Sequence, residues 1–159
     1  MNDLVIRRAE NGDLPRLVAH NLAMAEETEG KILDAARVSD GTRAVLGDER
    51  KGFYLLARRG DAVIGQLMIT YEWSDWRNGV FWWIQSVYVV PAERRQGVYR
   101  ALYAHVSAMA RKTENVCGVR LYVEKENRSA QETYRALGMN RTDYLLFEVD
   151  YVLGESDKL

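Results

Sequence analysis

The sequence predicts an α/β fold, in which a mixed sheet has an antiparallel hairpin region and one parallel pair of strands. Apolar residues alternate or run together over short segments, which is typical of strands, and recur every three to four residues over longer segments, which is typical of amphipathic helices. The predicted order is βααβββαβαβ, and a helix between two strands indicates a parallel pair. The length of 159 residues suits one domain with a proper core.

The N-terminal half is predicted to contain a strand, two helices and a hairpin. In order, the segments are a strand at 4–9, helices at 13–30 and 34–46, and hairpin strands at 52–58 and 62–70. Asp13 is the expected N-cap of the first helix, which ends near Gly30. The hairpin turn at 59–61 is short and contains a glycine, as tight hairpins require.

The C-terminal half is predicted to alternate strands and helices. An aromatic loop at 71–79 ends in the turn-forming pair Asn78-Gly79. The following segments are a strand at 80–90, a helix at 97–112, a strand at 118–123, a helix at 129–137 and a last strand at 141–151. Residues 154–159 are expected to form a frayed tail of the single domain 1–159.

One junction in this half combines the features of an anion site. The residues Val87 to Val90 favour a buried strand, which Pro91 ends because it has no N–H to donate. A helix begins near Gly97, and a helix N-terminus offers unpaired N–H groups and a partial positive charge. Three arginines flank this point: Arg94, Arg95 and Arg100. The junction suits a pyrophosphate, and an arginine-rich surface turn is the alternative.

The junction resembles the signature of the GNAT superfamily of acyl-coenzyme A-dependent N-acyltransferases. That signature, Arg/Gln-x-x-Gly-x-Gly/Ala, matches Arg94 to Tyr99, with Tyr99 where a small residue is usual. A second match lies downstream, at Asn127, Ala130, Tyr134, Gly138 and Met139. A third lies between Ile6 and Pro15. The resemblance covers nearly the whole chain.

The resemblance implies a single-domain GNAT fold. Its mixed, twisted sheet would have six to seven strands with about four helices, and strands four and five would splay apart to admit acetyl-coenzyme A. The pyrophosphate would bind the loop residues Arg94, Arg95, Gln96, Gly97, Val98, Tyr99 and Arg100. The pantetheine arm would pair with Val87, Tyr88 and Val89, whose backbone also supplies an N–H to the carbonyl oxygen. Asn127 would bind that arm, cap a helix, or do both.

The resemblance also implies catalytic roles. Tyr134 matches the residue that assists the departing thiolate, and we expect a hydrogen bond from it because a tyrosine pKa of about 10 exceeds a thiol pKa of about 8.5. A core tyrosine is the alternative. Many family members place a carboxylate on strand four or five, where Gln85 and Tyr122 stand here. Glu27 is therefore predicted as the general base, among the candidates Glu26, Glu27, Glu29, Glu72 and Asp75, each of which is otherwise a solvated acid.

The acceptor site is predicted from an aromatic and acidic group. Trp73 lies beside Glu72 and Asp75, and ring faces with carboxylates suit an organic cation. An oligomer interface explains the same residues equally well. At least one of Trp82 and Trp83 is expected in the core, because neighbouring strand residues face opposite sides of a sheet.

Composition argues against several classes of function. A net charge of −1 gives no overall basic surface for nucleic acid. The longest apolar run, Val80 to Ile84, is too short to cross a bilayer, and the first residues lack the apolar stretch of a signal peptide. The single cysteine, Cys117, forms no internal disulfide, and His20 and His105 lack the spacing of a metal site. We therefore expect a cytoplasmic protein with no metal, membrane or nucleic-acid partner.

The main functional hypothesis is an N-acetyltransferase. It would transfer the acetyl group of acetyl-coenzyme A to a primary amine of a small molecule, or to an exposed amino group, by direct attack. The alternative is a catalytically silent module that binds acyl-coenzyme A for sensing. Tyr134 and Asn127 favour the enzyme. Gln85 and Tyr122 stand where carboxylates are usual, so the sensing module is kept as the alternative. Homodimers are common in the resembled family, so a homodimer is a candidate assembly.

Overall fold

The computed structural model describes residues 3–154. By its internal contacts the chain divides into two units, Met1–Tyr122 and Val123–Leu159. The prediction of one domain over residues 1–159 stays a prediction. Of the tail expected at 154–159, only Gly154 is among the described residues.

The first unit is built on a mixed sheet with the strand order β1-β2-β3-β4-β5. Its strands are β1 (Leu4–Arg8), β2 (Phe53–Arg59), β3 (Ala62–Ser74), β4 (Gly79–Val89) and β5 (Val116–Arg120). The first four pair antiparallel in sequence order, and β5 pairs parallel to β4. The α/β class and the mixed sheet are confirmed. The predicted six to seven strands are wrong, because residues 3–154 contain a sheet of five.

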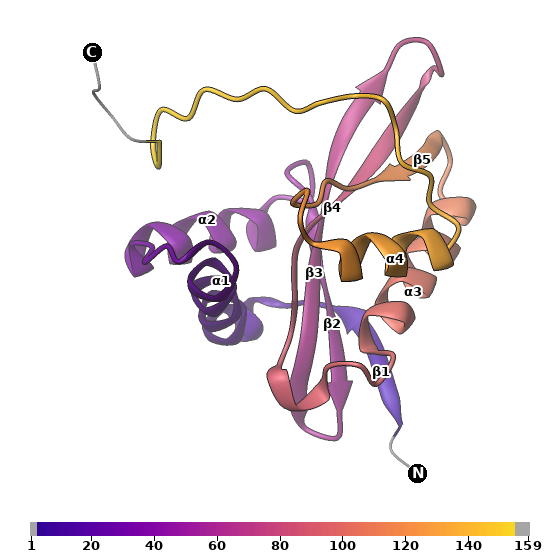
Figure 1. Cartoon of the computed structure of the whole chain (residues 1–159). Helices are drawn as coiled ribbons and strands as arrows, with labels where there is room; N and C mark the ends of the chain where they lie inside the picture. The colour runs from indigo at the N-terminus through magenta and orange to yellow at the C-terminus, as the bar shows by residue number, and fades with distance from the viewer. Residues whose placement is uncertain (1–2, 155–159) are drawn as a thin grey trace. The chain divides into compact units, whose positions relative to one another are not determined.

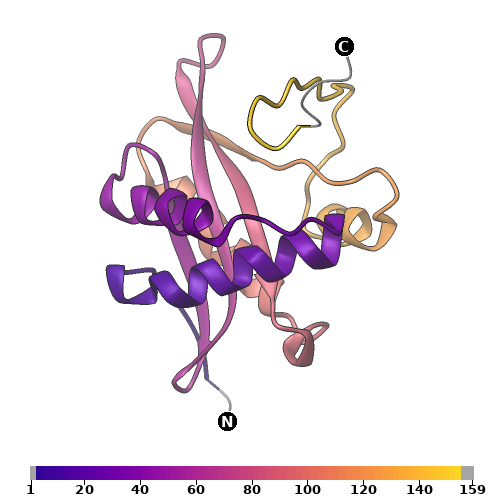
Figure 2. The same cartoon turned by 90° about the vertical axis from the view of Figure 1, so that its left-hand side faces the viewer.

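Four α-helices form where the sequence predicts them, to within one or two residues. They are α1 (Leu14–Glu29), α2 (Ala35–Gly47), α3 (Val98–Lys112) and, in the second unit, α4 (Arg128–Ala136). In the first unit α1 and α2 lie on one face of the sheet and α3 on the other (Figure 1), and Figure 2 looks onto the face that α1 and α2 cover. Two short 3-10 helices, Asn11–Asp13 and Pro91–Glu93, are the other helical segments of residues 3–154.

The strand β2 explains the two-layered core. Neighbouring strand residues face opposite sides of a sheet. Leu56 packs with Leu17 of α1, whereas Leu55 belongs to the larger cluster that includes Leu102 of α3. All of these side chains are fully buried. Burial on both faces is why β2 is apolar without strict alternation.

The carboxylate of Asp13, at the start of α1, is held by residues that precede the helix. Asp13 precedes α1 but its carboxylate does not cap that helix. It accepts from Arg7 at 2.8 and 2.9 Å, and from the Glu10 N–H at 2.7 Å. These bonds lower the pKa of Asp13, chiefly through Arg7. Asp13 is thus the N-cap residue of α1 by position, as predicted, but its side chain makes no capping hydrogen bond because the charged partner Arg7 holds it.

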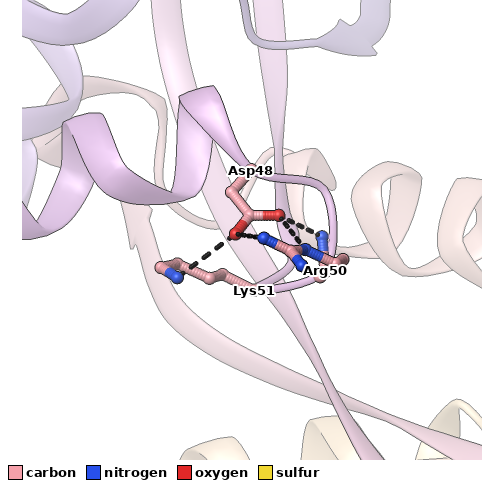
Figure 3. A network of polar contacts seen from close by, with 3 residues as sticks. All are labelled: Asp48, Arg50 and Lys51. Carbon is pink, nitrogen blue, oxygen red and sulfur yellow. Dashed lines mark hydrogen bonds and ion pairs between the residues drawn. The ribbon is translucent and has the colours of Figure 1, made fainter.

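The turn from α2 into β2 is closed by a small ionic network around Asp48 (Figure 3). Its carboxylate accepts from the side chain of Arg50 at 2.9 and 3.0 Å and from Lys51 at 3.3 Å. The Arg50 hydrogen bonds, with a contribution from Lys51, lower the pKa of Asp48 to about 2. Asp48 therefore stays ionised at any ordinary pH and orders the turn before the sheet begins.

Three predicted segments differ from the structure because strand pairing depends on distant residues. Residues 71–74 belong to β3 rather than to a loop, since they pair with residues 79–82 of β4. β5 ends at Arg120 rather than at residue 123, because β4 pairs with it only as far as Trp83. The strand predicted at 141–151 is wrong: the described residues give this segment no strand and no sheet partner.

Candidate functional site

A bulge interrupts β4 in the middle of the sheet. Ser86 and Val87 of β4 together lie opposite the single residue Leu67 of β3. Ser86 has a φ of 51°, a left-handed value that a residue with a side chain adopts at some cost. Bulges turn backbone groups out of the sheet's regular ladder and are common beside active sites. This one lies directly at the predicted thioester-binding residues Val87 to Val89.

Beyond Trp83, β4 has an open edge on the β5 side. The two strands pair only between residues 80–83 and 116–120. β5 then ends, whereas β4 continues to Val89. Within residues 3–122, no strand covers this edge of β4 from Ile84 onward. Its backbone groups can therefore pair with an extended ligand as an added strand would. The splay that the resemblance predicts between strands four and five stays a prediction.

A buried polar network holds the bulge in place. Gln66 of β3 is fully buried, and its Nε2 donates to the Ser86 carbonyl at 3.1 Å and to Asn21 Oδ1 at 2.9 Å. Its Oε1 lies 3.1 Å from His20 Nδ1. Because the amide oxygen of Gln66 can only accept, the His20 Nδ1–H is the donor, and burial lowers the pKa of His20, which favours the neutral ring. The network ties α1 to the two central strands at the bulge.

The loop after β4 forms an anion cradle at the start of α3. Gly97 has a φ of 80° and Arg95 a φ of 63°, so two left-handed residues shape the loop. The helix begins at Val98, directly after Gly97. Its first internal hydrogen bond runs from the Ala101 N–H to the Gly97 carbonyl at 3.0 Å. The N–H groups of Val98 and Arg100 precede that bond and are available to an anion. A Cβ added at Gly97 would meet nothing within 4 Å, so the space above the loop is open.

The loop side chains divide into two kinds. Arg95 and Arg100 are exposed and extend into solvent beside the cradle. Arg94 instead turns back: its Nε donates to the Val89 carbonyl at 2.9 Å and its Nη2 to Glu27 Oε2 at 2.6 Å. Gln96 donates to the Ala92 carbonyl at 2.9 Å. Arg94 and Gln96 thus hold the loop's shape, and Arg95 and Arg100 supply its unneutralised charge.

The structure brings Glu27 of α1 to this loop. Besides accepting from Arg94, its carboxylate accepts from the Tyr88 hydroxyl at 3.0 Å. The hydrogen bond from Arg94, with help from that of Tyr88, lowers the pKa of Glu27. Burial, and then Glu27 itself, raises the pKa of Tyr88. A lowered pKa makes a carboxylate a weaker proton acceptor, so these contacts favour a positioning role over the predicted role of base.

The predicted acceptor residues lie at the other end of the sheet. Glu72 and Trp73 are in β3 next to its turn, and Asp75 is in that turn. Trp73 pairs with Val80, which is seven positions from Val87 along β4, or about 23 Å at about 3.3 Å per residue. The structure therefore does not bring these three residues to the bulge. Glu72 already forms an ion pair with Arg120, which weakens the electrostatic attraction of Glu72 for a cation.

The second unit holds the two remaining predicted residues. Asn127 precedes α4, and its Oδ1 accepts from the Ala130 N–H at 3.1 Å, so it caps the helix. Its binding to the cofactor stays a prediction. Tyr134 lies within α4 and is half-buried, and burial raises its pKa. A raised pKa agrees with a hydroxyl that donates a hydrogen bond and keeps its proton.

Sequence reasoning missed the residues of the buried network. Gln66 offered one signal, a polar residue inside an otherwise apolar strand, and buried polar side chains are uncommon enough to be informative. His20 offered none, because it is spaced as an ordinary helical residue. Trp82 is buried, which confirms that one of the paired tryptophans is in the core.

Residues 3–154 contain neither a cluster of metal-ligating side chains nor a helix that could span a membrane. None of their His, Cys, Asp and Glu side chains form a group of three or more that could hold a metal ion. In that same part of the chain, no helix has the length and apolar character needed to cross a bilayer.

Known structures resemble the chain over most of its length. A possible acetyltransferase from Clostridium difficile 630 is 46% identical, with a TM-score of 0.87 over 94% of this chain and 98% of its own. A predicted acetyltransferase with acetyl-CoA from Clostridium acetobutylicum is 19% identical, with a TM-score of 0.74 over 93% of this chain and 96% of its own. AAC(6')-Iy, in complex with the bisubstrate analog CoA-S-monomethyl-acetylneamine, is 18% identical, with a TM-score of 0.73 over 94% and 99%. The last two establish the fold alone.

The family assignment comes from the sequence. The model of the acetyltransferase (GNAT) family matches residues 17–139, well over half of the chain. The match contains the bulge, the glycine loop and α4. No curated protein sequence matches the chain. The chain therefore belongs to the acetyltransferase (GNAT) family and is an acyl-coenzyme A-dependent N-acetyltransferase.

Proposed function

We propose that this enzyme transfers the acetyl group of acetyl-coenzyme A to a primary amine of a small molecule, or to an exposed amino group, by direct attack of the amine on the thioester. The observation that carries the proposal is one continuous stretch of chain. A bulged strand with an open edge leads into a left-handed glycine loop and then into a helix N-terminus. Acetyl-coenzyme A supplies the thioester, and the chain binds, orients and polarises it.

The residues fit the two ends of such a molecule. The open cradle at Gly97 supports binding of the pyrophosphate by backbone N–H groups, including those of Val98 and Arg100. The charges of Arg95 and Arg100 add to the helix dipole. The open edge of β4 supports pairing with the pantetheine arm, and an N–H of the bulge would stabilise the negative charge that grows on the carbonyl oxygen.

We place the acceptor amine at the C-terminal end of α1. This end contacts β4 through the Glu27–Tyr88 hydrogen bond, so it lies beside the open strand. Two further acids, Glu26 and Glu29, are exposed there, at the negative end of the helix dipole. Both favour a cationic amine. In the proposed reaction Tyr134 donates a hydrogen bond to the departing thiolate and Asn127 binds the cofactor arm.

Calorimetric titration with acetyl-coenzyme A tests the cofactor half of the proposal. Wild-type protein binds it, and Arg100→Gln weakens the affinity by about tenfold, which is the effect of losing about 1.4 kcal/mol. Arg43→Gln, at an exposed arginine of α2, is the matched control and leaves the affinity unchanged. Absence of heat from acetyl-coenzyme A and from free coenzyme A would overturn the proposal.

Release of free thiol from acetyl-coenzyme A, measured with a panel of primary amines, tests the transfer. The panel includes neamine, because a structural relative was solved with an acetylneamine analog, and also spermidine and lysine. Cofactor binding without thiol release for any amine would favour the silent sensing module instead.

Glu27→Gln separates the two roles of that residue. If Glu27 is the base, the variant shifts the acid limb of the pH–rate profile. If it positions the loop through Arg94, the variant weakens binding of coenzyme A and leaves the pH profile in place. We expect the second result.

A further inference from the structure

The side chain of Arg94 closes one point on the open edge of β4. Its Nε donates to the Val89 carbonyl at 2.9 Å. Neighbouring residues of a strand point their backbone N–H and C=O groups to opposite edges. The N–H of Val90, the residue after β4, donates to the Ile64 carbonyl of β3 at 2.9 Å, so the backbone groups of Val89 face the open edge. Arg94 therefore occupies the Val89 carbonyl, and its guanidinium stands where an added strand would place its own donor.

Two other side chains hold the guanidinium at this point. Arg94 Nη2 donates to Glu27 Oε2 of α1 at 2.6 Å, and the Tyr88 hydroxyl donates to the other oxygen of that carboxylate at 3.0 Å. The Arg94 Cζ also lies 5.5 Å from the centroid of the Tyr88 ring, within the range of a cation–π contact. The planar guanidinium serves the carbonyl and the carboxylate together because its N–H donors lie in a fixed fork. All of these residues belong to the first unit.

We infer that Arg94 is a positioning residue that sets the register of the pantetheine arm on β4. The inference rests on the proposed function, in which the arm pairs with this edge as an added strand does. The arm contains secondary amides, each with an N–H that needs an acceptor and a carbonyl that needs a donor. Because the Val89 carbonyl is occupied, an amide of the arm accepts from the Val89 N–H but does not donate to Val89. The ladder of the arm therefore ends at Val89, beside the loop that receives the pyrophosphate.

The register decides whether the thioester meets the bulge. Backbone groups that face one edge of a strand recur every second residue, or about every 6.6 Å at about 3.3 Å per residue. A slip of the arm by one such step moves the thioester carbonyl away from the bulge N–H that polarises it, and a misplacement of only about 1 Å can cost about a hundredfold in rate. Removing the Arg94 side chain uncovers the Val89 carbonyl and admits the slipped register. The variant therefore loses turnover even when it is saturated with cofactor.

Steady-state kinetics of Arg94→Ala provide the first test, with the thiol-release assay and an amine that the wild type acetylates. At saturating acetyl-coenzyme A we expect kcat to fall by about tenfold or more. The KM for acetyl-coenzyme A rises as well, because Arg94 also shapes the loop. Arg43→Ala is the matched control, since Arg43 is an exposed arginine of α2 that pairs with Asp40 at 2.8 Å, and its kcat and KM equal those of the wild type.

The outcomes separate this inference from the proposed function. A raised KM with the kcat of the wild type would show that Arg94 serves only the loop or the pyrophosphate, and would overturn the inference alone. A wild type that releases no thiol with any amine fails the proposed function, and the inference with it. The Arg94 side chain is 45% exposed, so its removal leaves no buried cavity. Arg94→Met keeps the apolar stem without a donor, and takes the place of Arg94→Ala if that variant does not fold.

S-acetylpantetheine gives the second test, because it has the arm and the thioester but no pyrophosphate. The kcat/KM of Arg94→Ala for this compound should fall by about tenfold or more, since the arm is the part that Arg94 aligns. A fall confined to acetyl-coenzyme A, with the kcat/KM of the wild type for S-acetylpantetheine, would assign Arg94 to the pyrophosphate and refute the inference.

Discussion

Replacing Gln66 by methionine tests whether the buried network sets the shape of β4. The change keeps the length of the side chain but removes both of its donors and its acceptor. It leaves the buried Asn21 Oδ1 and His20 Nδ1–H, and the partly buried Ser86 carbonyl, without this partner. An unsatisfied buried polar group costs about 1–3 kcal/mol. Three such groups are left, but relaxation of the structure and the burial of a thioether offset part of their combined cost. We therefore expect the free energy of unfolding to fall by about 2–5 kcal/mol.

Urea unfolding measures this loss, and Gln85→Met is the matched control. Gln85 is the same residue type, lies on β4 beside the bulge, is half-buried, and has one side-chain bond, to Thr70 Oγ1. The control should lose about 1 kcal/mol or less. At an m value of about 2 kcal/mol/M, Gln66→Met lowers the midpoint by about 1–2.5 M. Folded stabilities of about 5–15 kcal/mol leave the variant folded in buffer.

A second measurement connects the network to function. If Gln66 holds the bulge at Ser86, the folded variant also binds acetyl-coenzyme A more weakly, because the edge of β4 no longer has its bound shape. Equal midpoints for Gln66→Met and Gln85→Met would refute the energetic argument. A large loss of stability with unchanged affinity for acetyl-coenzyme A would show that the network supports the core but not the site.

Three other predictions concern the loop, the thiolate and acid stability. Gly97→Ala forces a side chain into a left-handed φ of 80° and should lower the free energy of unfolding in urea by about 1–2 kcal/mol, with weaker cofactor binding. The control Gly41→Ala, within α2, should raise that free energy by about 0.5–1 kcal/mol. Changes of the same sign in the two variants would contradict the left-handed role of Gly97 in the loop. Tyr134→Phe should lower turnover by about tenfold or more while the protein stays folded, and wild-type turnover would exclude the assigned hydrogen bond. Asp13→Asn should lose about 1 kcal/mol at pH 7, because its partly exposed bonds to Arg7 stabilise only the ionised form. The folded pKa of Asp13 is lowered, so this stabilisation is complete above about pH 4, the unfolded value, and is lost as pH falls through the folded one; a stability difference between variant and wild type that persists unchanged at pH 2 would contradict it.

Features set by neighbouring residues could be predicted from the sequence. The four helices, the turn at Gly60 and the position of Gly97 at the mouth of α3 follow from apolar spacing, from glycine's tolerance of left-handed backbone and from proline's missing N–H. The loop's affinity for an anion could be predicted in the same way, because a helix N-terminus has unpaired N–H groups whatever residues surround it. The family motif at Arg94 to Tyr99 is also local, so the class of enzyme could be read from it.

The tertiary structure decided everything that depends on residues far apart in the chain. Glu27 and Arg94 meet because α1 packs against β4. The register of β3 against β4 places Trp73 opposite Val80, about 23 Å along the strand from Val87. Gln66 could be recognised as buried, but only the register of β3 against β4 shows that it holds Ser86. A strand exists only where a partner completes its hydrogen bonds. Residues 71–74 therefore became part of β3, whereas the equally strand-like residues 141–151 pair with no strand among residues 3–154.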